Sequence, residues 1–157
     1  MDKLKTLRIE KKLTQQQVAN LVGISLRSYK SYENDEDKQN TIKYNYIMDQ
    51  LSKINIIDEN NGILEIEDIS QKCKNVFSQY DVKFCYLFGS YAKGLAKPSS
   101  DVDLLISTNL KGLKFYELVE EIRTILCKKV DVLNVNQLNN NIELIEEILK
   151  DGIKIYG

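Results

Sequence analysis

Two aspartates separated by one residue, Asp101 and Asp103, introduce a run of apolar residues that extends to Ile106. Side chains two positions apart on a strand project from the same face, so these carboxylates would lie side by side. Paired carboxylates repel each other unless a cation lies between them. Mg²⁺ suits such a place, because it binds through one or two carboxylates together with phosphates. The pair therefore predicts a metal-dependent reaction at a phosphate.

A third aspartate, Asp131, interrupts the apolar segment 130–133. A lone carboxylate in a buried strand is costly unless it has a partner; the alternative is an aspartate at a strand edge that faces water. If the two strands are neighbours, Asp131 joins the metal site and can accept the proton of an incoming hydroxyl. Two metal ions about 3.5–4 Å apart would then bracket an in-line displacement. We therefore expect Asp101, Asp103 and Asp131 to be catalytic residues and the ligands of two Mg²⁺ ions.

The apolar segment 82–88, a predicted strand, ends at Gly89 and Ser90. Where a buried strand passes into a helical turn, backbone N–H groups converge and favour a phosphate. Glycine lets the phosphate approach the backbone, and Ser90 adds a hydroxyl donor. A Gly-Ser pair alone is common, but here ten intervening residues separate it from Asp101. Together the two motifs predict a site for nucleotide phosphates.

The sequence contains no histidine and has a net charge of −1. The first fact excludes Ser-His-Asp triads, Cys-His dyads, His-ligated zinc and histidine general bases. The second excludes a protein that coats nucleic acid by charge alone. Cys73, Cys85 and Cys127 show no CxxC spacing, and we expect all three to be buried reduced thiols.

A polar cluster at 58–62 separates two kinds of pattern. Helical patterns precede it, and helix and strand patterns alternate after it. We therefore expect a two-domain protein: an all-α helical bundle at 1–56, a linker at 57–63, and an α/β (α+β) domain at 64–157 with a small mixed sheet flanked by helices. In the second domain the patterns predict helices over 66–80, 115–126 and 141–150, strands over 82–88, 102–107 and 129–135, and a short tail at 153–156.

The first domain contains a helix-turn-helix pattern between two further predicted helices, 3–12 and 41–54. Thr14 and Gln17 are spaced as a capping box. Gly23 can end that helix in the left-handed conformation, and Ser25 caps the next one. Such a unit lays its second helix in the major groove of DNA.

Residues 1–55 resemble the lambda-repressor/Cro-like (XRE) helix-turn-helix family, whose signature after the second helix is similar to Tyr32-Glu33-Asn34. The resemblance implies operator DNA as a partner and a homodimer on paired half-sites. Arg27 can read guanine bidentately, whereas Leu26 cannot hydrogen-bond a base through its side chain. The alternative is a helical module for protein contact alone. The DNA-contacting positions that the resemblance implies are Gln15, Gln16, Leu26, Arg27, Lys30 and Ser31.

The pattern of Gly-Ser, ten residues and Asp-x-Asp resembles the DNA polymerase beta-like nucleotidyltransferase superfamily, and Asp131 matches its third carboxylate. The resemblance implies ATP as the substrate and nucleotide contacts by Gly89, Ser90 and Ser100. It also implies that the domain at 64–157 is a nucleotidyltransferase and the bundle at 1–56 a DNA-binding domain.

More narrowly, residues 64–157 are similar to the minimal nucleotidyltransferases, small antitoxins that pair with HEPN-domain toxins. In that family the enzyme moves AMP from ATP to a tyrosine hydroxyl of the RNase toxin and so silences it. The resemblance implies a Mg²⁺-dependent protein adenylyltransferase and a hetero-oligomer with the toxin. Many relatives carry arginine directly after Gly-Ser, where this chain has Tyr91; Lys93 or Lys97 could supply the charge instead.

Two alternative functions stay open. One is a DNA-binding regulator whose second domain binds nucleotide without catalysis, and the other is a small-molecule nucleotidyltransferase of the aminoglycoside type. No stretch reaches the ~18 apolar residues that span a bilayer, and the charged first residues lack the apolar region of a signal peptide. We therefore expect a cytoplasmic protein with no membrane partner.

Overall fold

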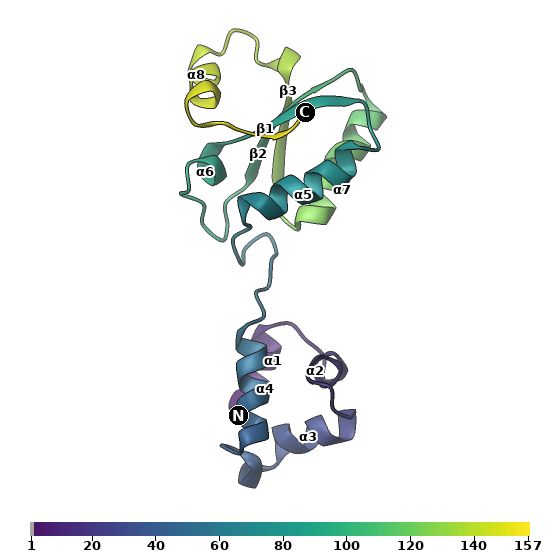
Figure 1. Cartoon of the computed structure of the whole chain (residues 1–157), viewed down its shortest axis with the longest axis vertical. Coiled ribbons are helices and arrows are strands. Elements are labelled where there is room, and N and C mark those ends of the chain that lie inside the picture. Colours follow the sequence, from purple (N-terminus) through teal and green to yellow (C-terminus); the bar gives the residue numbers. More distant parts are fainter. Residues whose placement is uncertain (1) are drawn as a thin grey trace. The chain divides into compact units, whose positions relative to one another are not determined.

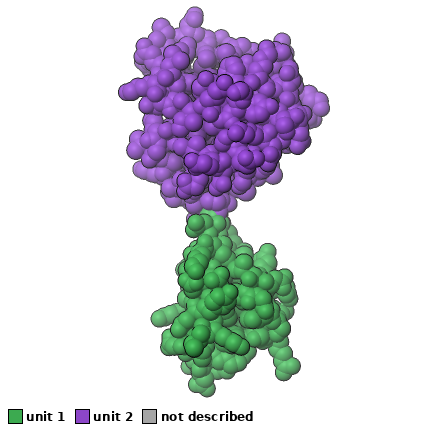
Figure 2. Space-filling view, in the orientation of Figure 1, with its two compact units in different colours: residues 1–56 green, residues 57–157 purple. Residues whose placement is uncertain are grey.

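The chain forms two compact units, residues 1–56 and residues 57–157. The structure is a computed structural model, and it describes residues 2–157. Figure 1 shows the helices and strands of both units, and Figure 2 colours the first unit green and the second purple. Each unit encloses a hydrophobic core of its own.

The first unit is a bundle of short helices around a buried cluster that includes Leu4, Val18, Tyr29 and Leu51. Its elements are α1 (Lys3–Glu10), α2 (Gln15–Val22), α3 (Leu26–Asn34), the 3-10 turn η1 (Glu36–Lys38) and α4 (Ile42–Ser52). The predicted all-α bundle is therefore confirmed.

The turn between α2 and α3 follows the local sequence rules. Thr14 and Gln17 form the predicted capping box, and the Ser25 side chain accepts from the Ser28 N–H. Gly23 ends α2 at φ 71°, in the left-handed region that glycine reaches without a steric penalty. Ala19 is fully buried. These four features confirm the predicted helix-turn-helix.

The second unit is a four-stranded mixed sheet with flanking helices. Its strand order is β3-β2-β1-β4; β2 and β3 are parallel, and the other pairs are antiparallel. This architecture confirms the predicted fold class. The elements are α5 (Ile66–Phe77), β1 (Val82–Phe88), α6 (Gly89–Ala92), β2 (Val102–Thr108), α7 (Leu113–Leu126), β3 (Val130–Asn134), the 3-10 turn η2 (Val135–Gln137), α8 (Ile142–Asp151) and β4 (Ile153–Tyr156).

Successive side chains of β2 pack on opposite faces of the sheet. Leu104 and Ile106 pack into the large core that α5 and α7 complete, whereas Leu105 packs with Ile148 of α8 on the other face. Figure 1 shows α5 and α7 lying side by side along the sheet. Because both faces are covered, β2 reads as a continuous apolar run in the sequence.

Two local expectations differ from the structure. The tail at 153–156 is a strand, because Ile155 is buried in the core and the backbone pairs with β1. Cys127 is exposed, whereas Cys73 and Cys85 are buried as expected. Cys127 ends α7 at φ 55°, so the chain turns there and its side chain leaves the apolar face. Within residues 2–157, no helix is both long and apolar enough to cross a membrane.

Candidate active site

The predicted carboxylates lie on, or directly before, two neighbouring strands that pair in register. In the antiparallel pair of β1 and β2, Phe88 lies opposite Asp103; in the parallel pair of β2 and β3, Asp103 lies opposite Asp131. Asp101 directly precedes β2. The sheet therefore brings Asp103 between the end of β1 and Asp131, on the face that α8 covers.

The turn after β1 passes directly against Asp103. Gly89 has a φ of +70°, and a Cβ at this position would lie 2.1 Å from Oδ2 of Asp103. Only glycine satisfies both the left-handed backbone and this close approach. Ser90 follows at the second position of α6. Since α6 has a single turn, its backbone N–H groups, rather than a helix dipole, are what it offers to a phosphate.

Asp103 experiences the strongest electrostatic perturbation in this region. The side chain is half-buried. Burial raises the pKa of Asp103 to about 6, and the carboxylates of Asp131, Asp101 and Glu147 act in the same direction. The carboxylates around Asp103 are therefore not fully offset by positive groups, which favours the binding of a cation.

Glu147 is a functional-site neighbour that the sequence patterns did not indicate. It lies on α8 and accepts a hydrogen bond from Lys93 Nζ at 2.7 Å, an ion pair that links α8 to the turn after α6. Lys93 is one of the two lysines expected to replace the arginine of relatives. Tyr91, at the position of that arginine, is only 3% exposed and packs in the core. Position 91 therefore supplies no positive charge near the Gly-Ser turn, and Lys93, two residues further on, is paired with Glu147.

The loop before β2 carries the predicted nucleotide contact Ser100. Its hydroxyl accepts from the Lys97 N–H at 2.8 Å, and its own N–H donates to the Lys97 carbonyl at 2.9 Å. Ser100 therefore closes the turn that leads into Asp101. Its hydroxyl hydrogen is still available for a ligand.

An apolar cavity of about 760 Å³ opens beside the carboxylates. Asp103 and Asp131 form part of its wall, and α7 contributes Phe115, Tyr116 and Val119. The sequence patterns predicted α7 as a helix but did not indicate that it borders the site. The remaining lining residues are Phe88, Gly112, Val130, Val132 and Leu133.

The donor set suits Mg²⁺. The three aspartates carry carboxylate oxygens, the donor type that Mg²⁺ prefers, and Asp103 is held next to like charges that a cation would offset. Within the described part of the chain, no three carboxylate or thiol side chains converge tightly enough to enclose an ion by themselves. An incomplete protein shell is typical of Mg²⁺, which keeps several waters and takes further ligands from substrate phosphates.

In the helix-turn-helix unit, the six predicted DNA contacts differ in their exposure to solvent. Gln16, Arg27 and Lys30 are exposed, and the others are half-buried. Gln15 Nε2 donates to Oε2 of the buried Glu33 at 2.7 Å. The half-buried positions are Gln15, Leu26 and Ser31.

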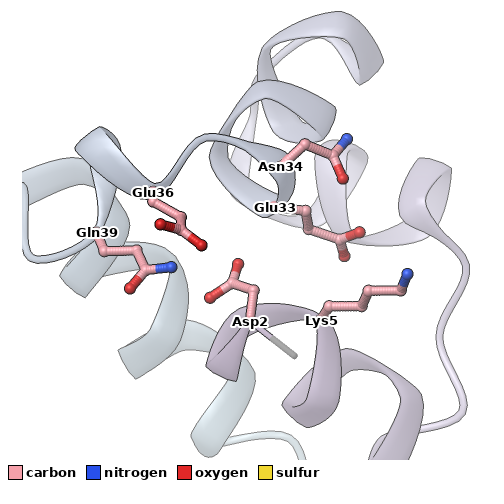
Figure 3. Close-up of a pocket in the computed structure, with 6 residues that line it drawn as sticks. All are labelled: Asp2, Lys5, Glu33, Asn34, Glu36 and Gln39. Carbon is pink, nitrogen blue, oxygen red and sulfur yellow. The ribbon is translucent and has the colours of Figure 1, made fainter.

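Ser31 also has an internal partner, because the Lys38 ammonium donates to its hydroxyl. Arg27 and Lys30 are therefore the cations that α3 presents to solvent. A hollow of about 570 Å³ elsewhere in this unit has three acidic residues among the six that line it (Figure 3). None of the predicted DNA contacts lines it, and its acidic wall disfavours a phosphate backbone. Figure 3 shows Asp2, Lys5, Glu33, Asn34, Glu36 and Gln39 around this hollow.

A glycine-serine turn against paired strand carboxylates, on a small mixed sheet, defines a nucleotidyltransferase. Comparison with known proteins supports this class: the family of polymerase beta nucleotidyltransferases matches residues 71–157, and a helix-turn-helix family matches residues 4–41. The chain belongs to the polymerase beta nucleotidyltransferase family and carries a helix-turn-helix domain in front of it.

Similar proteins are named as protein adenylyltransferases. One from Methanocaldococcus jannaschii is 38% identical over 47% of this chain and 90% of its own length. The protein adenylyltransferase MntA of Thermococcus cleftensis is 36% identical over 50% of this chain and 82% of its own. A solved structure of an AMPylated HEPN toxin from Shewanella oneidensis with its antitoxin matches at 19% identity and a TM-score of 0.43, over 57% of this chain and 70% of that one.

Gly89→Ala is expected to lower nucleotide transfer by about 10–100-fold, because the new methyl group would collide with the Asp103 carboxylate. Gly94→Ala is the matched control: Gly94 has nearly the same backbone angle, φ +71°, but a Cβ there meets nothing within 4 Å. Both variants carry the strain of a left-handed alanine, roughly 1 kcal/mol. Transfer assays at equal folded concentration separate the two effects, and equal activities in both variants would contradict the expectation.

Proposed function

We propose that this protein is an antitoxin that transfers AMP from ATP to a hydroxyl group, that of a tyrosine, on a HEPN RNase toxin. Its first unit binds operator DNA. The observation that carries the proposal is the register of the sheet, which sets Asp103 between the Gly89 turn and Asp131. The kinship with protein adenylyltransferases supports a protein acceptor.

The proposed mechanism assigns one task to each group. Backbone N–H groups after Gly89 and the Ser90 hydroxyl bind the triphosphate, and Asp101, Asp103 and Asp131 would hold two Mg²⁺ ions. When bound, the metal offsets the charge of the phosphates and lowers the pKa of the attacking hydroxyl. Asp131 accepts the proton of that hydroxyl. The hydroxyl oxygen forms a bond to the α-phosphorus, and the bond from this phosphorus to the leaving pyrophosphate breaks.

The cavity beside Asp131 supports an aromatic acceptor. Its α7 wall is formed by Phe115, Tyr116 and Val119, which suits a phenol ring better than the small hydroxymethyl group of serine. Asp131 is exposed and therefore accessible to a side chain that another protein inserts. The acceptor hydroxyl would then meet the carboxylate that takes its proton.

The experiment combines the purified protein with α-labelled ATP, Mg²⁺ and the HEPN-type protein encoded next to it. We expect label on the partner, lost when either Asp101 or Asp103 is replaced by asparagine. Labelling that survives both substitutions, or no labelling at all, contradicts the proposal. A protein that binds ATP but never transfers it would instead be a regulator, and turnover of an aminoglycoside without the partner would indicate a small-molecule enzyme.

We further propose that the two compact units are separate domains with separate ligands. Arg27 and Lys30 are exposed on α3, the helix that this motif lays in the major groove. We expect a homodimer on paired half-sites, and a hetero-oligomer when the toxin is present. Asp35, Glu36 and Asp37 follow α3 closely, and their carboxylates repel a nearby phosphate backbone. We therefore expect few contacts between cations and phosphates, and a shallow salt dependence of DNA binding.

Arg27→Ala is expected to weaken binding to the DNA upstream of the protein's own gene by about 1–3 kcal/mol and to relax the preference at one base pair. Lys53→Ala is a charge-matched control, because Lys53 lies on the last turn of the bundle and pairs with Asp49 at 2.6 Å. Fluorescence anisotropy at two salt concentrations measures both. An Arg27→Ala protein that binds as tightly as the control would indicate that α3 does not read DNA.

A further inference from the structure

Lys128 is fully buried, and its ammonium group has three backbone partners. Nζ donates to the carbonyl oxygens of Pro98 at 2.6 Å, Gly62 at 2.7 Å and Asn61 at 3.1 Å. An ammonium group has three donors and no acceptor. Its hydrogen-bonding capacity is therefore used completely by these three carbonyls.

Burying the ammonium group of Lys128 costs free energy, because the charge loses its contact with water. Burial lowers the pKa of Lys128, and the nearby Asp58 carboxylate acts in the opposite direction. An apolar side chain would avoid the cost of desolvation, but it would leave the three carbonyls without this donor. The position is therefore specialised for holding backbone segments together, since packing alone does not call for a charge.

One of the segments that Lys128 holds carries Asp101. Pro98 belongs to the turn that the bonds between Lys97 and Ser100 close. On the far side of Asp101, the Val102 N–H donates to the carbonyl of Lys129 at 2.9 Å. Lys128 and its neighbour thus fasten the chain on both sides of Asp101.

The other segment is the first turn of the second unit, which follows directly on the helix-turn-helix unit in the chain. Asp58 and Asn61 close this turn with reciprocal backbone hydrogen bonds of 3.0 and 3.3 Å. The Asn61 side chain adds bonds to the Asp58 carboxylate at 2.8 and 3.0 Å. Lys128 binds the carbonyls of Asn61 and Gly62, so it joins this turn to the loop before β2.

We propose that Lys128 is a positioning residue for nucleotide transfer, which holds the Asp101 loop in place and couples it to the connecting turn at 58–62. The proposal rests on the role of Asp101 as a metal ligand in the proposed function. The first prediction is that loss of the ammonium loosens two segments that lie more than 30 residues apart in sequence. The second is that a substitution in the connecting turn also loosens the backbone around Asp101.

Lys128→Met is the main test variant, because it keeps the length of the side chain and removes the three donors. Leu118→Ala is the control for general destabilisation: Leu118 is fully buried in the same core and lines neither the cavity nor the loop. Asn61→Ala is the second test variant. It weakens the connecting turn while the backbone carbonyls and Lys128 remain, and it serves if Lys128→Met does not fold.

Hydrogen–deuterium exchange is the readout that does not depend on activity. In Lys128→Met we expect the amides of Asn61, Ser100 and Val102 to exchange at least 10-fold faster than in the wild type and in Leu118→Ala. In Asn61→Ala we expect the amides of Ser100 and Val102 to accelerate as well. Acceleration confined to one of the two segments, or shared equally by Leu118→Ala, overturns the proposal.

Kinetics supply the second readout, at a temperature where all variants are folded. We expect Lys128→Met to lower kcat by about 10–100-fold and to raise the Mg²⁺ concentration for half-maximal rate, as substitutions behind metal ligands do. The KM for ATP should rise as well, because the predicted nucleotide contact Ser100 lies in the loop that Lys128 holds. The rise should be smaller than the fall in kcat, since Gly89 and Ser90 lie on a different element. A normal kcat and Mg²⁺ response overturn the positioning role. If Asp101→Asn retains full activity, the proposed function of Asp101 fails, while the exchange rates still decide the coupling.

Discussion

Asp103→Asn is expected to abolish nucleotide transfer and, in the same protein, to raise the melting temperature measured without metal. Transfer should fall on the order of 10³-fold, because the central ligand of the proposed metal site is lost. Stability should rise, because the fold holds the Asp103 carboxylate half-buried next to Asp131, Asp101 and Glu147. Asparagine has nearly the same shape and no charge to place there.

The sign of the stability effect follows from the pKa. Burial and the neighbouring carboxylates raise the pKa of Asp103 from 3.8 to about 6, so folding favours the protonated acid. The wild type therefore loses stability as pH rises from about 4 through about 6, and the asparagine variant does not. With a discount for screening by solvent at a half-exposed group, we expect a gain of about 1 kcal/mol at pH 7. For a unit of this size that is about 4 °C in Tm.

Thermal unfolding with and without Mg²⁺ measures the effect. The wild type should gain Tm on adding Mg²⁺, because a ligand that binds only the folded state stabilises it; the variant should gain little. Near pH 4 the two metal-free proteins should melt together. The exposed Asp81 provides the control Asp81→Asn, which should change neither Tm nor transfer. A variant that is less stable than the wild type at pH 7, or that keeps a tenth of its activity, contradicts the arrangement described above.

Arg8→Ala is expected to unfold the helix-turn-helix unit. The Glu33 side chain is completely buried, and Arg8 binds both of its oxygens, at 2.5 and 3.3 Å. Gln15 and Tyr29 each donate a further bond of 2.7 Å. Burial alone would raise the pKa of Glu33, but these donors outweigh it and hold the pKa below its ordinary value. The carboxylate is therefore charged in the fold and depends on Arg8.

Removing one partner of a buried ion pair costs about 3–5 kcal/mol, because the other charge stays behind unpaired. A unit of 56 residues has a total stability of only about 3–8 kcal/mol. The variant should therefore lose most of its helical circular-dichroism signal from this unit, together with DNA binding. AMP transfer by residues 57–157 should persist if the two units are separate domains, as we propose.

Two controls define the origin of the effect. Lys53→Ala breaks an exposed ion pair with Asp49 and should cost less than about 0.5 kcal/mol. Arg8→Met combined with Glu33→Leu removes both charges and should recover most of the stability. In Arg8→Ala alone, stability should increase as pH falls toward 5, because the unpaired Glu33 can then be neutralised. An Arg8→Ala unit that remains folded at neutral pH would show that Gln15 and Tyr29 suffice for the carboxylate.

The sequence by itself determined the local elements and the motifs. The capping box of Thr14 and Gln17, the left-handed Gly23 and the limits of β1 all follow from rules that act within a few residues. The spacing from Gly89-Ser90 to Asp101 is likewise a local property, and its resemblance to the polymerase beta-like superfamily indicated the class of enzyme. These inferences needed no knowledge of which strands are neighbours.

Only the tertiary structure decided which distant residues share the site. The alignment of Asp131 with Asp103 depends on β3 pairing parallel to β2 in one register. The contact of Glu147 with Lys93 and the three carbonyls around Lys128 join segments at least 30 residues apart. Such contacts form because both faces of the sheet must be covered and buried polar groups must find partners. Sequence periodicity shows which face of a segment is buried. Which helix or strand packs against that face is determined by the packing of the whole unit.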